Sequence, residues 1–190
     1  GGVKNMKYPC GAKKTYSNHS IHANRGMTLE NDIGQSNDYY LVNNIAVIYK
    51  KPTPITIAKV DYPPGTNGII REGYFKTPST TDYNGIYKGK YIDFEAKETK
   101  HKTSFPLSNI HPHQIKHLKK IEEHGGISFI IVRFSLLNET YLLTTPQLIS
   151  FLEHNKRQSI PIAYFKENGY ILKDKYNPRV DYIKIINQLY

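Results

Sequence analysis

The sequence predicts an α/β fold in which a mixed central sheet is flanked by helices. Three observations support this class. Apolar residues recur at helical spacing in several segments, short β-branched and aromatic runs lie between those segments, and one stretch has the turn residues of a β-hairpin. The predicted order is helix, strand, extended ribbon, hairpin, helix, strand, strand and helix, without internal repeats.

The first segment differs in composition from the rest. Residues 1–25 contain no acidic residue but several basic ones, among them Lys13, Lys14 and Arg25. This composition predicts a flexible basic arm, and a terminus without a role is the alternative. At 190 residues the chain is long enough for one domain with an ordinary core, which we assign to residues 26–190.

A helix is predicted from Thr28 to Asn43, because Thr28 is a good N-cap and apolar residues follow at helical spacing. Glu30 falls in its first turn, where an acidic side chain is favoured by the helix dipole. Taken alone, Glu30 therefore fits a surface role. The run Ile45–Tyr49 predicts the first strand.

Residues 50–75 break this pattern with prolines at positions 52, 54, 63 and 64. Two extended arms, 55–60 and 69–75, flank a Pro-Pro-Gly tip. We expect an excursion from the main body over about 51–75, because prolines suit an isolated ribbon better than a central strand. An ordinary hairpin at the sheet edge is the alternative.

Residues 79–103 predict a β-hairpin. A strand approaches Asp82, a turn lies at Asn84–Gly85 or at Lys88–Gly89, and a second strand runs from Lys90 to Thr99. After the hairpin we expect the following elements: a loop at 103–107, a helix at 112–123 with Gln114 in its first turn, a strand at 127–134, a turn at 137–138, a strand at 140–144, a helix from 146, a short mixed stretch at 161–176 and a helix at 181–189.

The hairpin carries the strongest indication of chemistry. Side chains alternate along a strand, so Glu95 and Lys97 share one face, and Asp82 lies on the partner segment. Two carboxylates with an ammonium beside them suit a hard divalent cation. The ordinary alternative is a surface ion pair. Asp93 and Glu98 are expected to point away from Glu95 or to lie at the strand end, as structural residues.

Composition limits the partners. The net charge of +10 and the pI of about 9.5 favour a nucleic acid, through neutralisation of phosphates. The sequence has no apolar run of 18 residues, so we expect no membrane span. The single cysteine, Cys10, excludes an intramolecular disulfide and agrees with a cytoplasmic location. No catalytic Ser-His-Asp order, phosphate-binding loop or dinucleotide fingerprint is present.

The spacing of Asp82, Glu95 and Lys97, followed by a helical Gln, resembles the PD-(D/E)XK nuclease core. The resemblance is closer to RecU-type Holliday junction resolvases and covers about residues 25–190. The strings that carry it are longer than a three-residue motif, and they lie at residues 25–30, 45–54, 77–99, 105–107, 113–114 and 178–182.

This resemblance implies a restriction-endonuclease-like core and a Mg²⁺ site, with Mn²⁺ as an alternative cation. The implied magnesium positions are Thr80, Asp82, Glu95 and Gln114. Lys97 corresponds to the lysine that stabilises the transition state, so the implied catalytic residues are Asp82, Glu95 and Lys97. Glu30 corresponds to an additional helix acid of the wider nuclease core.

The resemblance also implies the DNA substrate and the assembly. The excursion at about 51–75 corresponds to the family's stalk, which enters the centre of a four-way junction. The implied partners are four-way junction DNA and a second copy of the chain, and a recombinase or branch-migration protein is a further expected partner. Together with the basic arm, the expected DNA-contacting residues are Lys13, Lys14, Arg25, Lys50, Lys51, Arg71, Phe75 and Lys76.

Two other functions share the same charge and projection. A non-catalytic DNA-binding protein that mediates recombination would use the Asp-Glu-Lys group as a salt-bridge network. A restriction-type endonuclease would cut linear duplex at a fixed sequence. Metal-dependent cutting of a synthetic four-way junction separates both from a junction-resolving endonuclease.

Overall fold

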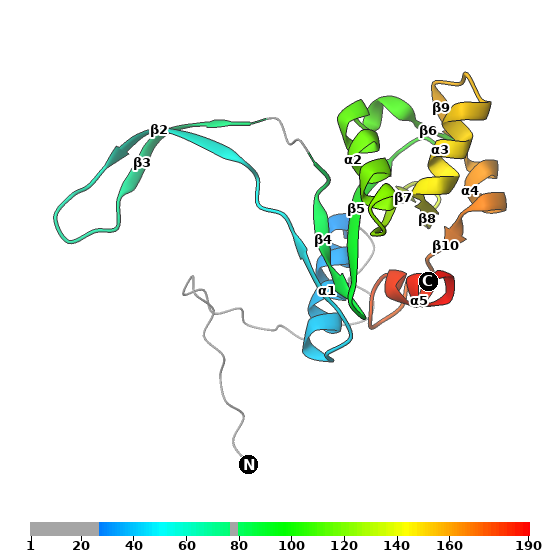
Figure 1. Cartoon of the computed structure of the whole chain (residues 1–190), viewed down its shortest axis with the longest axis horizontal. Coiled ribbons are helices and arrows are strands. Elements are labelled where there is room, and N and C mark those ends of the chain that lie inside the picture. The colour runs from blue at the N-terminus through cyan, green and yellow to red at the C-terminus, as the bar shows by residue number, and fades with distance from the viewer. Residues whose placement is uncertain (1–26, 77–79) are drawn as a thin grey trace, which may run out of the picture.

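The structure is a computed structural model that describes residues 27–76 and 80–190. The expected basic arm, with Lys13, Lys14 and Arg25, lies outside these residues. Six strands form one sheet in the order β1-β4-β5-β7-β8-β10 (Figure 1). Their bounds are β1 Val47–Lys50, β4 Tyr83–Tyr87, β5 Lys90–Thr99, β7 Ile127–Phe134, β8 Glu139–Thr144 and β10 Tyr170–Ile171.

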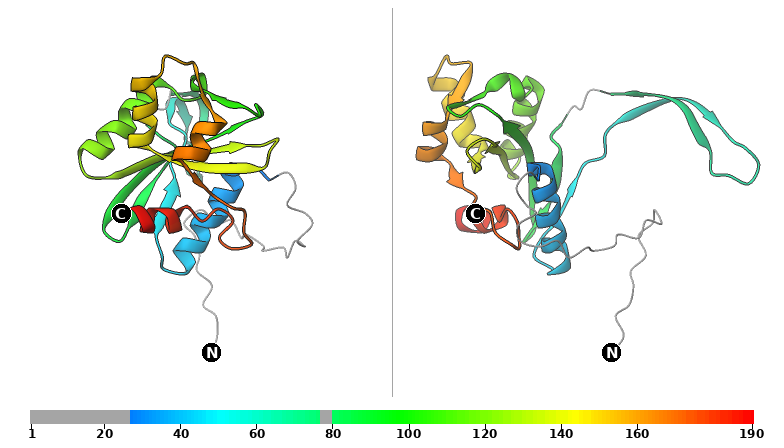
Figure 2. Two further views of the ribbon diagram at one scale, coloured as in Figure 1. Left: turned by 90° about the vertical axis from the view of Figure 1, so that its right-hand side faces the viewer. Right: turned by 180° about the vertical axis from the view of Figure 1, so that it is seen from behind.

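The sheet is mixed, because β5 and β7 are parallel whereas the other neighbouring pairs are antiparallel. Helices cover both of its faces (Figure 2). On one face lie α1 (Leu29–Val42) and α5 (Tyr182–Leu189), and on the other lie α2 (Pro112–Glu123), α3 (Thr145–His154) and α4 (Ile162–Asn168). The predicted fold class, a mixed sheet flanked by helices, is confirmed.

Alternation along the central strands divides the core into two apolar clusters. On β7, Phe129 and Ile131 pack on the side of α1 and α5, whereas Ile130 and Val132 pack on the side of α2, α3 and α4. All eight residues of β7 are buried. This burial on both faces explains why the strand reads as a nearly continuous apolar run.

The helix predicted from Thr28 is present as α1. The Thr28 hydroxyl accepts a hydrogen bond from the Asn31 backbone N–H at 3.2 Å, as an N-cap does. The C-terminal helix, α5, packs against α1 through a hydrogen bond between the Tyr182 hydroxyl and the Asn37 side chain. These contacts hold the C-terminal segment on the face of the sheet opposite α2.

The predicted hairpin is formed by β4 and β5, with its turn at Lys88–Gly89. Both turn residues have positive φ, 48° and 76°, as a two-residue hairpin turn requires. Gly85 lies inside β4, where an added Cβ would come within 2.0 Å of the Val47 carbonyl oxygen. The glycine therefore permits β1 to pair with β4. The strand begins at Tyr83, after Asp82, whereas the sequence predicted a strand that approaches Asp82.

The two extended arms predicted between residues 50 and 75 are the strands β2 (Ile55–Asp61) and β3 (Ile69–Phe75). They pair with each other in a separate two-stranded sheet, hereafter the ribbon, which extends away from the rest of the protein (Figure 1). None of its residues is classed as buried. The ribbon therefore contributes no side chain to either apolar cluster.

The expectation for residues 103–107 was also wrong. Residues 103–107 were expected to form a loop, but Ser104–Pro106 forms β6, which pairs with β9 (Ser159–Pro161). A 3-10 turn, η1, follows at Leu107–Asn109. A strand of three residues is too short to show an alternating pattern, and its partner lies far away in the sequence, so the sequence did not indicate this pairing. Among the described helices, none has the length and apolar character needed to cross a bilayer.

Candidate active site

The candidate site lies on the face of β5 that is turned towards α2. Phe94 packs in the cluster with α1, so its neighbour Glu95 points to the opposite side. The Glu95 side chain is fully buried. Lys97, two residues on, places its Nζ 2.9 Å from Glu95 Oε1 and remains partly exposed. The predicted pair on one strand face is therefore present.

Two other predicted residues meet Glu95 at its second oxygen. The Asp82 backbone N–H donates to Glu95 Oε2 at 3.1 Å, which places Asp82 beside the acid across the hairpin. The Gln114 side-chain amide donates to the same oxygen at 3.0 Å. Gln114 also caps α2, because its Oε1 accepts from the His111 backbone N–H at 3.1 Å. The start of α2 is thus anchored on the site.

The environment of Glu95 raises its pKa from 4.5 to about 7. Burial is the main cause, because it disfavours the charged form, and the neighbouring charge of Asp82 raises the pKa further. The ammonium of Lys97 acts in the opposite direction but does not offset the burial. A raised pKa on a buried carboxyl beside a second acid is typical of functional sites.

The oxygens at this site suit a hard cation. Asp82 and Glu95 supply two carboxylates, a ligand type that Mg²⁺ prefers, whereas the Thr80 hydroxyl lies 3.4 Å from Lys51 Nζ. Within the described part of the chain, Glu95 Oε1 is buried, and its cationic partner is the Lys97 ammonium at 2.9 Å. A buried acid whose cationic partner is a partly exposed lysine fits a cation ligand. Gln114 turns its amide nitrogen to Glu95, so the amide would need to turn over for its oxygen to face a cation bound by Glu95.

Glu30, the additional acid, lies on the exposed part of α1. Its carboxylate pairs with Lys50 at 2.5 Å, and 62% of its side chain is exposed. The charges of Glu30, Asp82 and Glu95 all add to the burial that raises the pKa of Tyr83. Glu30 therefore faces the same region as the two site acids, although its direct contact is with Lys50.

Asp93 was missed as part of the site. It was expected to point away from Glu95, but residues two apart on a strand share a face, and Asp93 lies on the α2 side with Glu95 and Lys97. Its side chain is fully buried and contacts Lys51 and His117. The alternation of β5 was the signal that could have identified it.

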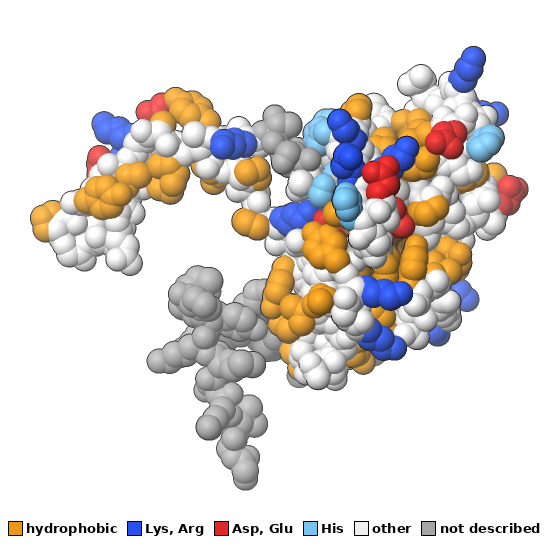
Figure 3. Space-filling view, in the orientation of Figure 1, with side chains coloured by type: hydrophobic (Ala, Val, Ile, Leu, Met, Phe, Trp, Pro, Cys, Tyr) orange, Lys and Arg blue, Asp and Glu red, His pale blue; other side chains and the backbone are white. Residues whose placement is uncertain are grey.

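The described residues expected to contact DNA are held in different ways. Lys51 is largely covered and pairs with Asp93 at 3.1 Å, and Arg71 pairs with Asp61 on the ribbon at 2.7 Å. Phe75, at the end of β3, is 81% exposed. Lys76 is also exposed, and its backbone N–H donates to Pro54. Lys and His side chains gather over α2 and the adjoining strands (Figure 3).

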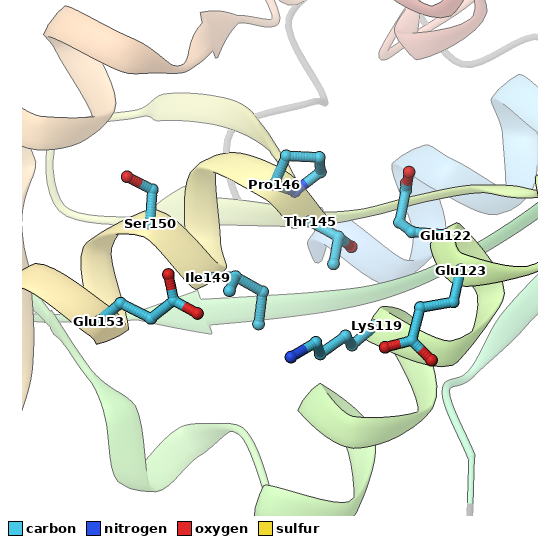
Figure 4. Close-up of a pocket in the computed structure, with 8 residues that line it drawn as sticks. All are labelled: Lys119, Glu122, Glu123, Thr145, Pro146, Ile149, Ser150 and Glu153. Atoms are coloured by element: carbon cyan, nitrogen blue, oxygen red, sulfur yellow. The ribbon is translucent and has the colours of Figure 1, made fainter.

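A shallow pocket between α2 and α3 lies away from these residues (Figure 4). Lys119 and Glu122 of α2 and Ile149 of α3 are among its lining residues. The Glu122 carboxylate accepts from the Ser128 backbone N–H at 2.7 Å, so it serves to pack α2 against β7. None of the predicted site residues lines this pocket.

The fold and the site define an α/β protein that gathers two acids, a lysine and a glutamine on one face of its central sheet. The sequence matches the family described as Recombination protein U over residues 24–188. The chain therefore belongs to the RecU family. Among its relatives, proteins called Holliday junction resolvase RecU are 50% identical in Bacillus cytotoxicus and 48% identical in Bacillus cereus strain B4264, each over 97% of this chain and 98% of the relative.

Proposed function

We propose that this protein is a Mg²⁺-dependent endonuclease that resolves four-way DNA junctions by paired symmetric nicks during recombination and repair. The observation that carries the proposal is the convergence of Asp82, Lys97 and Gln114 on the buried carboxyl of Glu95. The names of the relatives, Holliday junction resolvase RecU, supply the substrate.

The roles follow from the contacts of each residue. Asp82 and Glu95, with Thr80 and the oxygen of Gln114, would hold Mg²⁺ or Mn²⁺. When bound there, the cation would lower the pKa of a water molecule and polarise the scissile phosphate. Lys97 keeps its ammonium beside Glu95 and is partly exposed, so it is positioned to neutralise negative charge that develops on the phosphate.

The ribbon and the basic surface would hold the DNA. The ribbon leaves the main body close to the site, because Lys51 precedes it and Thr80 follows it. We propose that it serves as the stalk that enters the junction centre, with Arg71 and Phe75 in contact with DNA. Two symmetric nicks require two sites, so we propose a homodimer. A recombinase or branch-migration protein is a further proposed partner, and the proposed location is the cytoplasm.

The test is cleavage by the purified protein of four-way, duplex and single-stranded DNA in Mg²⁺ or in EDTA. We expect cuts only on the junction, only with Mg²⁺, and at symmetric positions. Junction binding without any cutting would favour the non-catalytic mediator, and cutting of linear duplex at a fixed sequence would favour a restriction-type enzyme. Asp82→Asn should bind the junction without cutting it.

A further inference from the structure

Asp93 is a buried acid surrounded by an unusual number of donors. Its side chain is fully buried on β5, yet four other side chains contact its two oxygens. The Thr81 hydroxyl donates to Oδ1, and Oδ2 lies 2.9 Å from the Tyr91 hydroxyl, 3.1 Å from Lys51 Nζ and 3.1 Å from His117 Nε2. A buried carboxylate without such partners would strongly destabilise the fold. The surroundings of Asp93 are therefore built to keep this charge.

Two of these donors, Lys51 and Thr81, come from the two places where the ribbon joins the main body. Lys51 lies just before β2, and Thr81 lies after the return of β3. The Lys51 ammonium also contacts the hydroxyls of Thr80 at 3.4 Å and Thr81 at 3.1 Å. The Lys51 backbone N–H donates to the Asp82 carbonyl at 2.7 Å. One carboxylate thus holds both ends of the ribbon against β5.

The segment held in this way carries two of the proposed cation ligands. Thr80 and Asp82 precede β4, which begins at Tyr83, so the ladder of the six-stranded sheet does not fix them. Their placement depends on the hydrogen bonds from Asp82 N–H to Glu95 and from Lys51 N–H to the Asp82 carbonyl, and on the contacts of Lys51 and Thr81 with Asp93. A change at Asp93 should therefore be felt at Thr80 and Asp82.

We propose that Asp93 is a positioning residue for the cation site. It places Thr80 and Asp82 opposite Glu95 by holding Lys51 and Thr81, while its own oxygens are occupied by hydrogen bonds. This inference rests on the proposed Mg²⁺-dependent function. Mutation of a residue that orients a metal ligand by a hydrogen bond commonly lowers metal affinity by about 10- to 100-fold.

The first measurement is the dissociation constant for Mn²⁺ in the absence of DNA. It is obtained from titrations in which electron paramagnetic resonance reports the concentration of the free ion. In Asp93→Asn we expect the constant to rise by about 10-fold relative to the wild type. Junction affinity in EDTA should stay unchanged, because no cation is then involved. Cleavage should fall at low Mn²⁺ and recover as Mn²⁺ is raised, whereas a purely structural role would show no such recovery.

Asp181→Asn is the matched control. Asp181 also accepts from a tyrosine and faces a lysine, with distances of 3.0 Å to the Tyr40 hydroxyl and 3.4 Å to Lys175 Nζ. It lies at the start of α5, on the other side of the sheet. We expect this variant to bind Mn²⁺ as the wild type does. An equal loss in Asp181→Asn and Asp93→Asn would overturn the proposal in favour of a general effect on folding.

Tyr91→Phe keeps the test valid if Asp93→Asn does not fold. It removes one donor from a residue that is 40% exposed, so the fold should tolerate it. A smaller rise in the Mn²⁺ constant is expected, and unchanged Mn²⁺ binding in Tyr91→Phe and Lys51→Met would overturn the proposal. If the wild-type protein binds no Mn²⁺, the cation site itself is refuted. Failure of the proposed function is thereby distinguished from failure of the proposed role of Asp93.

Discussion

Two buried acids, Asp32 on α1 and Glu95 on β5, differ in the number of cations that surround them. Asp32 Oδ1 lies 3.1 Å from Arg179 Nε, and its Oδ2 lies 2.7 Å from an Arg133 guanidinium nitrogen. Each oxygen of Asp32 therefore has a charged donor. Glu95 has a single cationic partner, Lys97, which lies 2.9 Å from Oε1 and is partly open to solvent, and its Oε2 accepts from two uncharged N–H donors.

This difference separates an acid that holds elements together from an acid that is available to a cation. Asp32 joins α1, β7 and the C-terminal segment, because its two arginines come from the latter two. Glu95 has one cationic partner in place of two, and burial raises its pKa to about 7. Its surroundings are therefore incomplete without a proton or a cation.

Among the variants that test the difference between Asp32 and Glu95, Glu95→Gln should have the largest effect on cleavage. Removal of the charge should lower junction cleavage in Mg²⁺ by on the order of 1000-fold, since the cation contributes several kcal/mol to the transition state. Stability should not fall, because the buried charge is also removed. Cleavage rates and urea unfolding measure both quantities, and cleavage near the wild-type rate would refute the assignment of Glu95.

Arg133→Met should have the opposite effects, a loss of stability with little change in the cleavage rate. It leaves Asp32 with Arg179 alone, so unfolding in urea should show a loss of about 4 kcal/mol, as expected for a broken buried pair. Cleavage per folded molecule should stay near that of the wild type. Lys166→Met is the control, because the exposed pair of Lys166 with Glu139 should contribute less than about 1 kcal/mol. Similar losses in both variants would remove the distinction between the pairs.

The pH dependence of stability should reveal the raised pKa of Glu95. Its pKa rises from 4.5 to about 7 on folding, so the folded state binds this proton more tightly. The resulting stability is complete below pH 4.5 and is lost as the pH rises through 7, by up to about 3 kcal/mol. Urea unfolding in EDTA at pH 5 and pH 8 should show this loss in the wild type and a flatter profile in Glu95→Gln. Identical profiles would contradict the raised pKa.

The smallest expected effect concerns the ribbon, which holds no buried acid. Replacement of residues 61–68 by a two-residue Asn-Gly turn should weaken junction binding by roughly tenfold, about 1.4 kcal/mol, and duplex binding by less. The reason is that only the junction offers a central opening to the ribbon. Fluorescence anisotropy with both DNAs in EDTA measures this difference, and equal losses would count against insertion into the junction.

Much of the fold could be predicted because its signals are local. Thr28 as a cap, the turn residues Lys88 and Gly89 and the apolar run of β7 each depend on neighbours in sequence. The pairing of β6 with β9 could not be predicted in the same way, because each is only three residues long and they lie far apart. The role of Gly85 also required the partner strand, since its close neighbour is the Val47 carbonyl.

The sequence by itself determined that Glu95 and Lys97 share one face of a strand, because side chains alternate with a period of two. Only the tertiary structure decided that Asp82 and Gln114 reach the same oxygen of Glu95, that burial raises the pKa of Glu95 and that Asp93 holds both ends of the ribbon. These features depend on side chains from separate elements meeting in a packed interior. The spacing of residues along one strand carries no information about such contacts.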